Sequence, residues 1–380
     1  MLTRIELRHF KCFSLLKLPL RPLTLLSGVN ASGKSSVLQG LVLLHQTIRE
    51  HEWSTRLMLN GAAIRLGSVS DVIDQVHGRR HCGLALLDGD VAYEWEFAGE
   101  RGEMSMAVER VRVNGEGEER PERLWRLLPP GQGEDPLTAR LSGLTYLTAE
   151  RLGPRESYPL EDPQVAPVVG PAGEYAASVL YSGLDQPVID GLVMRDTPPT
   201  RLRQVEARMG QFFPGCGLTI DKLPQSNAVT LGIRTSRDMD FHRPVHTGFG
   251  LTQVFPIVVA ALSANRNDLL LIENPEVHLH PGGQALMGEF MAEVAAAGVQ
   301  VALETHSDHV LNGIRRAAKK QLLLPEDIAL HFFRPRQEAG LDPMRQVQSP
   351  SLDGEGNIDT WPDGFFDQFD KDMNYFAGWD

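Results

Sequence analysis

The stretch Gly28-Val29-Asn30-Ala31-Ser32-Gly33-Lys34-Ser35 decides how the rest of this chain is interpreted. It has the spacing G-x-x-x-x-G-K-[ST] and stands between an apolar strand pattern over 23–26 and a helical pattern over 37–48. Glycines allow consecutive backbone N–H groups to turn toward a phosphate, and the helix that follows presents its positive end there. The sequence therefore predicts a phosphate-binding loop that holds a nucleoside triphosphate.

Each side chain of this loop has an expected task. Lys34 would reach the β- and γ-phosphates, and the Ser35 hydroxyl would ligate Mg²⁺. ATP and Mg²⁺ are thus the predicted cofactors. The predicted ATP-binding residues are Gly28, Asn30, Ala31, Ser32, Gly33, Lys34, Ser35 and Ser36.

Composition narrows the class of protein. The 380 residues suffice for a large core, and the sequence has no apolar run long enough to cross a bilayer. The N-terminus reads as a strand, and the three cysteines are too widely spaced for a zinc site, which favours a cytoplasmic protein without a membrane partner. The net charge is −12, of which 351–380 carries eight acids and one lysine, or −7. The first 350 residues are only mildly acidic.

A second informative region runs from Leu269 to Pro281. Four apolar residues ending in Glu273 describe a buried parallel strand whose C-terminal end faces a ligand, and Glu273 would hold Mg²⁺ there through water. Pro281 suits the first turn of a helix that ends near Ala297. A further buried strand over 299–303 precedes Glu304-Thr305-His306-Ser307, where a histidine is well placed to sense the γ-phosphate.

Just upstream, Gly248-Phe249-Gly250 predicts a turn that opens onto an apolar helix over 257–262. Taken alone, this pattern is as typical of an ordinary loop as of an anion-binding helix N-terminus. His278 and His280 have the spacing of metal ligands, but a structural role in a turn is favoured because the sequence offers no third ligand. Arg151 follows a strand-like run and is interpreted either as a contact to phosphate or to an adjacent switch loop, or as one half of a strand-end ion pair.

The order of patterns along the chain predicts its organisation. Residues 1–50 and 244–335 would form the nucleotide-binding core, 80–140 a β-rich lobe, 141–243 a middle region, and 351–380 an acidic aromatic tail, all within one head over 1–380. Residues 116–135 are charged and rich in Gly and Pro, and are expected to be solvent-exposed. The predicted fold class is α/β, a mostly parallel core sheet flanked by helices with an antiparallel β lobe.

These pieces resemble a known family in their order. The opening 5–13, the segment 22–27 and the phosphate loop are similar to the N-terminus of the SMC, RecF and OLD ATPases, which are ABC-type heads. Glu273-Asn274-Pro275-Glu276 and the following His-Leu-His-Pro resemble the family's acidic strand and turn, and Thr305-His306-Ser307 its switch histidine. The resemblance covers 1–50 and 244–333. It is strongest to the short ATPases of bacterial phage-defence systems.

The resemblance implies a head that dimerises head to tail around two ATP molecules. In this implied dimer, Gly248, Gly250, Thr252 and Gln253 would form the signature that touches the partner's γ-phosphate. The position of the usual water-activating glutamate is held by Asn274, whose amide cannot accept a proton at neutral pH. Glu276 and Glu304 are candidate replacements, His306 is the third predicted catalytic residue, and Ser35 with Glu273 would hold the metal. Hydrolysis is therefore expected to be slow.

The predicted function is that of an ATP-dependent switch or clamp in antiphage defence or DNA repair, which controls a separate effector nuclease. DNA is a further candidate partner. Only 74 residues follow His306, which leaves little room for a nuclease domain within the chain. Two alternatives stay open, namely the nucleotide-binding subunit of a membrane transporter and a nucleotide-gated scaffold that does not hydrolyse ATP. The tail around Trp361–Asp367 is expected to pack on the head as a lid, with partner docking as the other interpretation.

Overall fold

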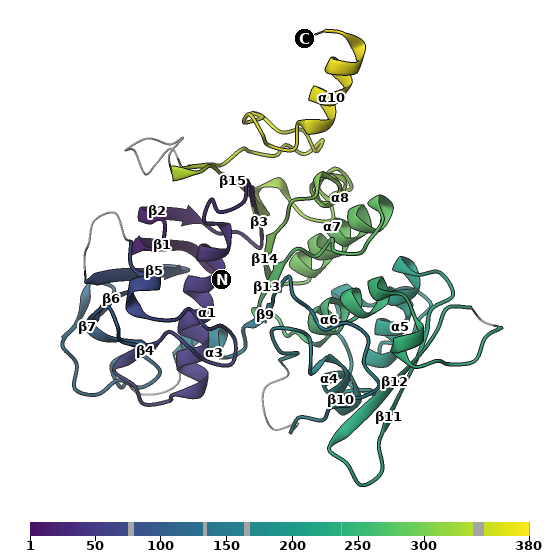
Figure 1. The fold of residues 1–380 in the computed structure, drawn as a ribbon, viewed down its shortest axis with the longest axis horizontal. Coiled ribbons are helices and arrows are strands. Elements are labelled where there is room, and N and C mark those ends of the chain that lie inside the picture. The colour runs from purple at the N-terminus through teal and green to yellow at the C-terminus, as the bar shows by residue number, and fades with distance from the viewer. Residues whose placement is uncertain (75–79, 132–134, 163–167, 237, 337–345, 380) are drawn as a thin grey trace. The chain divides into compact units, whose positions relative to one another are not determined.

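The computed structural model describes residues 1–74, 80–131, 135–162, 168–236, 238–336 and 346–379 (Figure 1). The chain divides into two compact units. Unit 1 comprises Met1–Ser142, Glu304–Asp308 and Leu324–Asp380, and unit 2 comprises Gly143–Leu303 and His309–Leu323. The predicted nucleotide-binding core thus contributes to both units. A single head over 1–380 stays a prediction.

Unit 1 contains a seven-stranded antiparallel sheet with the order β2-β1-β5-β6-β7-β4, and β8 pairs with β7. Its strands are β1 (Leu2–Phe10), β2 (Phe13–Pro19), β4 (Arg56–Met58), β5 (His81–Asp88), β6 (Val91–Ala98), β7 (Ser105–Val113) and β8 (Glu116–Glu119). Alternation along β1 and β5 buries Leu7 and Leu84 on one face of the sheet. The antiparallel β lobe is therefore larger than the predicted 80–140, because the N-terminal strand pair belongs to the same sheet.

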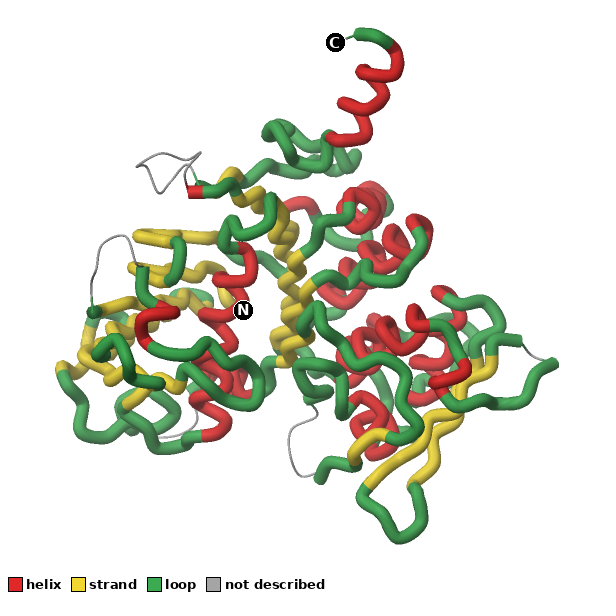
Figure 2. Tube along the Cα trace, in the orientation of Figure 1, coloured by secondary structure: helices red, strands yellow, loops and turns green. Residues whose placement is uncertain are grey.

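Helix α1 (Lys34–Glu50) packs on the buried face of this sheet, as the red helix beside the yellow strands in Figure 2 shows. A Cβ added at Gly40 would come 3.1 Å from the Leu7 side chain and 3.5 Å from that of Leu84, so this glycine allows the close approach. The other helices of unit 1 are α2 (Val69–Val72), α3 (Pro136–Ser142) and α10 (Gln368–Ala377), with the 3₁₀ helix η3 (Pro325–Asp327).

The strand that leads into the phosphate loop, β3 (Leu23–Gly28), pairs in parallel with β15 (Ile328–Phe333). Every residue of β15 is buried, and β16 (Val347–Gln348) extends this pair in the antiparallel direction. Further along, Phe365 of the tail is fully buried and its ring lies 5.5 Å from that of Phe332. The expected packing of 361–367 is confirmed at Phe365.

In unit 2, β13 (Leu269–Glu273) pairs in parallel with β9 (Thr145–Leu147), and a small antiparallel sheet has the order β10-β12-β11. The elements that fall largely in this unit are β10 (Tyr158–Pro159), α4 (Ala176–Ser182), η1 (Asp190–Leu192), α5 (Arg201–Phe212), β11 (Gly217–Lys222), β12 (Ala228–Arg234), η2 (Pro244–His246), α6 (Phe249–Ser263), α7 (Pro281–Ala296), β14 (Gln300–Glu304) and α8 (Asp308–Lys319). The two parallel pairs and their helices give the predicted α/β fold class.

Two local predictions need correction. The segment 116–135 is not exposed throughout, because Leu124 and Leu127 are buried in the core of unit 1. The apolar helix predicted over 257–262 begins eight residues earlier as α6, so Gly250 lies within a helix and not in an open turn. Residues 132–134 of the segment 116–135 lie outside the described part of the chain.

Candidate nucleotide site

The phosphate loop has a backbone conformation that its glycines make possible. Gly28 and Gly33 have φ of +134° and +103°, values that side chains strongly disfavour. A Cβ at Gly28 would stand 2.2 Å from the Phe333 carbonyl oxygen, and one at Gly33 would stand 2.5 Å from Cys12 Sγ. Glycine is thus required at both ends of the loop for conformation and for space.

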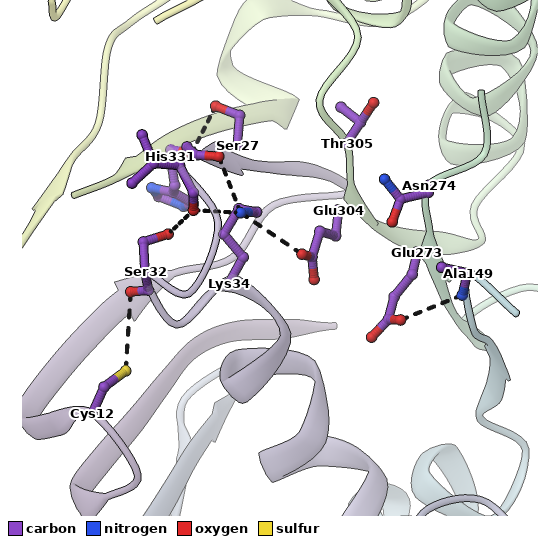
Figure 3. A network of polar contacts seen from close by, with 12 residues as sticks. Cys12, Ser27, Ser32, Lys34, Ala149, Glu273, Asn274, Glu304, Thr305 and His331 are labelled. Atoms are coloured by element: carbon purple, nitrogen blue, oxygen red, sulfur yellow. Dashed lines mark hydrogen bonds and ion pairs between the residues drawn. The ribbon is translucent and has the colours of Figure 1, made fainter. Parts of the chain in front are cut away.

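Lys34, the first residue of α1, is 3% exposed and points into the loop (Figure 3). Its Nζ donates hydrogen bonds to the carbonyl oxygens of Gly28, at 3.0 Å, and Val29, at 2.8 Å. The Glu304 carboxylate lies 3.9 Å from the same ammonium group. Burial lowers the pKa of Lys34 below its usual value, and Glu304 opposes that shift. The loop therefore holds a buried cation beside its own backbone.

Two residues outside the phosphate-loop motif, Cys12 and Gln346, contact the backbone of the loop. Ser32 Oγ donates to the Val29 carbonyl at 2.7 Å, while its own carbonyl accepts from Gln346 Nε2 at 3.3 Å. Cys12 Sγ approaches the Ser32 carbonyl at 3.9 Å (Figure 3). Gln346 lies more than 300 residues from the loop, and only the β3–β15–β16 pairing brings it close.

The exposed side of the loop and the N-terminus of α1 are suited to bind an anion such as a polyphosphate. Asn30 and Ala31 are exposed, Ser35 is half-buried, and the first turn of α1 contains no acidic residue. A helix N-terminus without acids keeps its positive end available to an anion. Together with Lys34, this arrangement suits the phosphates of a nucleotide.

Unit 1 also contains two of the three predicted catalytic residues. Glu304 is buried, whereas His306 is exposed. The Thr305 N–H donates to the Leu26 carbonyl of β3 at 3.1 Å, and Thr305 Oγ1 accepts from the Ser307 N–H at 3.0 Å. These bonds hold the segment 304–308 beside the strand that leads into the phosphate loop.

Glu273 lies in unit 2, at the C-terminal end of β13. One carboxylate oxygen accepts a hydrogen bond from the Tyr146 hydroxyl at 2.7 Å, and the other accepts from the Ala149 N–H at 3.4 Å (Figure 3). Tyr146 within β9 and Ala149 just after it thus orient the two carboxylate oxygens. The sequence reasoning missed Tyr146, whose polar hydroxyl in a buried strand was an available signal.

Arg151 is buried, and its guanidinium donates hydrogen bonds to the backbone. It donates to the carbonyl oxygens of Thr148, Glu273 and Asn274 at 2.9, 2.8 and 2.7 Å. Burial lowers the pKa of Arg151 to about 10, while the charges of Glu276 and Glu273 act in the opposite direction. Arg151 thus joins two segments by their main chains, while a phosphate or switch-loop contact and a strand-end ion pair stay predictions.

Asn274 adopts a left-handed backbone conformation with φ of +44° directly after β13. Its Nδ2 donates to Glu276 Oε1 at 3.3 Å. The amide at the position of the usual general base thus donates to Glu276, one of the two predicted catalytic carboxylates. Asparagine tolerates such a φ better than glutamate does.

The predicted signature residues lie at the start of α6. Gly248 is the N-cap residue and is exposed, as is Phe249, and Gly250 is half-buried. Thr252 Oγ1 donates to the Phe249 carbonyl at 2.9 Å. Gln253 Nε2 donates to the carbonyl oxygens of Arg151 and Leu152, both at 3.2 Å. Thr252 and Gln253 are buried within their own unit.

The H-x-H pair serves local structure. His280 Nδ1 accepts from the Gly283 N–H at 3.3 Å and caps α7, which confirms the structural interpretation of this residue. His278 packs against Phe249 with 5.6 Å between ring centroids. Within the described residues, no group of three or more His, Cys, Asp or Glu side chains is placed to hold a metal. Over the same residues, no helix combines the length and hydropathy needed to cross a membrane.

Comparisons with known proteins agree with this architecture. Residues 234–311 match a family described as "AAA ATPase domain", and 323–375 match one described as "Protein of unknown function (DUF3696)". No curated protein matches the chain in sequence at a significant level.

Three solved structures of SMC heads share the fold. A head bound to the C-winged helix domain of ScpA is 16% identical, covers 92% of this chain and 98% of its own, and has a TM-score of 0.59. A head from Pyrococcus furiosus, bound to the C-terminal domain of ScpA, is 12% identical over 99% and 98%, with a TM-score of 0.56. A head with coiled coil and joint from Pyrococcus yayanosii is 10% identical over 93% and 98%, with a TM-score of 0.51. The chain therefore shares the fold of SMC head domains, and part of it matches an ATPase family model.

Proposed function

We propose that this protein binds ATP with Mg²⁺ through its phosphate loop and uses the nucleotide as a slow switch that closes a dimer. The observation that carries the proposal is the placement of Lys34, whose buried ammonium lies against the Gly28 and Val29 carbonyls at the N-terminus of α1. A phosphate can replace those two carbonyls as the partner of the cation and form stronger, charge-assisted bonds. The loop would thus be ready for its ligand.

The remaining roles follow from the resemblance. Ser35 would ligate Mg²⁺ and Glu273 would hold it through water, and the ion would neutralise phosphate charge when bound. Gly248 and Gly250 would approach the γ-phosphate held by a second subunit, because they lie at the start of α6, where Gly248 is exposed and Gly250 is half-buried. Thr252 and Gln253 would act indirectly, since their side chains bond to carbonyls of their own unit and shape that turn.

Slow turnover follows from Asn274, which offers no proton acceptor at the position of the usual base. Glu276 is the nearest replacement that we propose, because Asn274 Nδ2 donates to its carboxylate. Glu304 is the second candidate base, and His306 the sensor of the γ-phosphate. Fast multiple turnover that Glu276→Gln leaves unchanged would contradict this assignment. The same amide makes a scaffold without hydrolysis the second candidate function, whereas no feature of the described residues favours a transporter subunit.

The biological setting we propose is bacterial antiphage defence or DNA repair, in the cytoplasm, with a separate nuclease as effector and DNA as a further candidate ligand. The resemblance to short phage-defence ATPases supports this setting. A similar fold that is bound to ScpA in two solved structures supports a partner protein. Phage infection of cells that express the protein with its genomic neighbours, compared between wild type and Lys34→Ala, tests the setting.

The switch itself is tested by solution mass and phosphate release in the same samples, with and without ATP–Mg²⁺. We expect ATP to raise the mean mass of the wild type, with phosphate release slower than one turnover per minute. Lys34→Ala should abolish both effects, while Lys222→Ala, an exposed lysine of unit 2, should preserve them. A mass that ATP does not change in the wild type would contradict the switch.

A further inference from the structure

The C-terminal helix α10 exposes an apolar stripe. Phe369, Met373 and Phe376 follow the i, i+4, i+7 spacing that places side chains on one helix face. Their exposed fractions are 69%, 52% and 81%. Helices that dock into grooves of other proteins use anchors with this spacing. The stripe is thus a docking surface that nothing in its own chain covers within the described residues.

The helix is held in shape before any partner binds. Lys371 Nζ lies 2.6 Å from an Asp363 oxygen and 3.0 Å from an Asp367 oxygen, and Gln368 Nε2 donates to Asp372 Oδ1 at 2.7 Å. The buried ring of Phe365 anchors the segment just before it. Residues 367–380 contain four aspartates and one lysine, so the exposed stripe belongs to an acidic segment. Its complement should be an apolar groove with a basic rim.

Such a groove exists on the outward face of the antiparallel sheet. The register of β1, β2, β5 and β6 places Leu15, Arg8, Gly83 and Glu96 in one row across the strands. The neighbouring row contains Lys17, Glu6, Ala85 and Glu94. Because Gly83 and Ala85 are small, β5 forms the floor between longer side chains. A cavity of about 630 Å³ lies here, lined among others by Arg8, Leu15, Lys17, His81, Gly83 and Glu96.

The rim of this groove has an excess of positive charge. Glu6 is buried and is shared by three cations, with Arg4 at 3.1 Å, Arg8 at 3.3 Å and Lys17 at 3.6 Å. The Glu96 carboxylate is matched by Arg110 at 3.1 Å. One carboxylate cannot neutralise three cations, so the β1–β2 side of the groove favours an acidic partner.

We propose that α10 of one copy of this chain docks into the groove of a second copy. The apolar stripe would lie over Gly83 and Leu15, and Asp372 beside the stripe would meet Arg8 and Lys17. A reciprocal exchange of the two helices closes into a symmetric dimer. The chain supplies both complementary surfaces, which favours a second copy over an unrelated protein. This association uses neither the phosphate loop nor ATP, so it is separate from the proposed switch.

The test is the dissociation constant of the dimer, measured by sedimentation without nucleotide in the Lys34→Ala protein. We expect a dimer at micromolar concentration, weakened at least tenfold by Phe376→Ser in the helix and by Lys17→Glu in the groove. Met104→Ser, which replaces another exposed apolar side chain of unit 1, and Lys222→Glu in unit 2 are the matched controls and should change nothing. Phe376 is 81% exposed, so its substitution should not impair folding.

A mixing experiment separates a second copy from the other possible occupants. The Phe376→Ser chain keeps its groove and the Lys17→Glu chain keeps its helix, so an equimolar mixture should form heterodimers that neither variant forms with itself. A protein that stays monomeric up to tens of micromolar would overturn the proposal, whether α10 binds its own groove or a different protein. A dimer that both variants preserve would overturn it as well. A nucleotide-free dimer would also raise the mass measured in the test of the ATP switch, so that test is repeated with the Phe376→Ser chain.

Discussion

Gly33 shows at the scale of one residue how tightly the phosphate loop is confined. Its φ is +103°, and a Cβ there would come 2.5 Å from Cys12 Sγ and 2.6 Å from the Phe13 ring. We predict that Gly33→Ala lowers the free energy of unfolding by roughly 2–4 kcal/mol, through backbone strain plus overpacking. Gly89 is the matched control, because its φ is +60° and nothing lies within 4 Å of its Cβ position. Gly89→Ala should cost about 1 kcal/mol, from conformation alone. Equal losses in chemical denaturation would contradict the role of packing.

Asn274 is the residue that we expect to limit the rate of ATP hydrolysis. We predict that Asn274→Asp, which replaces the amide by a carboxylate of the same shape, raises steady-state phosphate release about tenfold or more, because a positioned base contributes about 10²–10⁴-fold. Aspartate tolerates the left-handed backbone at this position. Asn267→Asp is the control, since Asn267 has a φ of +71° in the same unit. If both variants release phosphate at the wild-type rate, the absence of a carboxylate at 274 does not limit hydrolysis.

Individual residues were predictable from the sequence where a motif specifies chemistry at a fixed spacing. Gly28, Gly33 and Lys34 are such residues, because the loop conformation demands them locally. Tyr146 and Gln346 were not, since their partners Glu273 and Ser32 lie 127 and 314 residues away. Contacts of this kind depend on the pairing of distant strands, and a single sequence does not reveal that pairing.

At the scale of elements, Arg151 connects the end of β9 to the end of β13. We predict that Arg151→Met lowers the free energy of unfolding by roughly 2–4 kcal/mol, because the carbonyls of Thr148, Glu273 and Asn274 lose a buried donor. The exposed Arg155→Met is the matched control and should change stability by less than about 0.5 kcal/mol. Thermal denaturation of the two variants measures both losses of stability. A loss no larger than that of the control would mean that the three bonds stabilise little.

Two buried histidines make the stability of unit 1 depend on pH. His45 on α1 bonds to the Leu141 carbonyl, and burial lowers its pKa to about 4. His331 on β15 contacts Pro19 and Ser349, and burial lowers its pKa to about 4 as well. Both are neutral when folded, whereas an unfolded histidine takes up a proton near pH 6.5.

The unfolded state therefore binds more protons between pH 6.5 and 4, so stability is complete above pH 6.5 and falls as the pH drops through that window. At pH 5 the loss is about 2 kcal/mol for each histidine. Chemical denaturation at pH 7 and pH 5 measures this difference, and His331→Gln should reduce it. An equal pH dependence in the variant would show that His331 contributes nothing to it.

The elements themselves were largely predictable because their hydrophobic periodicity is local. The predicted N-terminal strand corresponds to β1, and the predicted strand that ends at Glu273 corresponds to β13. The helix predicted to start at Pro281 corresponds to α7. The start of α6 was misjudged because glycines at 248 and 250 read as a turn, although buried Thr252 and Gln253 continue the helix to Phe249. Burial of these polar side chains depends on partners elsewhere in unit 2, which periodicity does not capture.

At the scale of the whole molecule, the α/β class and the resemblance to SMC heads were predictable, and the fold comparisons confirm both. The extent of the antiparallel sheet was not, since β1 pairs with β5, whose residues lie far along the chain, as in the pair Arg8 and Gly83. From the sequence, the segment that forms α10 was predictable only as part of an acidic tail with aromatic residues. The exposure of these side chains, in an acidic segment, is visible only in the structure and is the basis of the docking that we propose.

The central claim is that the loop around Lys34 binds ATP, and equilibrium binding of ATP with Mg²⁺ to the purified chain tests it most directly. We predict one ATP per wild-type chain and binding that is about 10–100-fold weaker in Lys34→Ala, because a charge-assisted contact to phosphate contributes about 1.5–3 kcal/mol. Lys222→Ala should bind as the wild type does. Equal affinity of wild type and Lys34→Ala, or no binding by the wild type, would contradict the account.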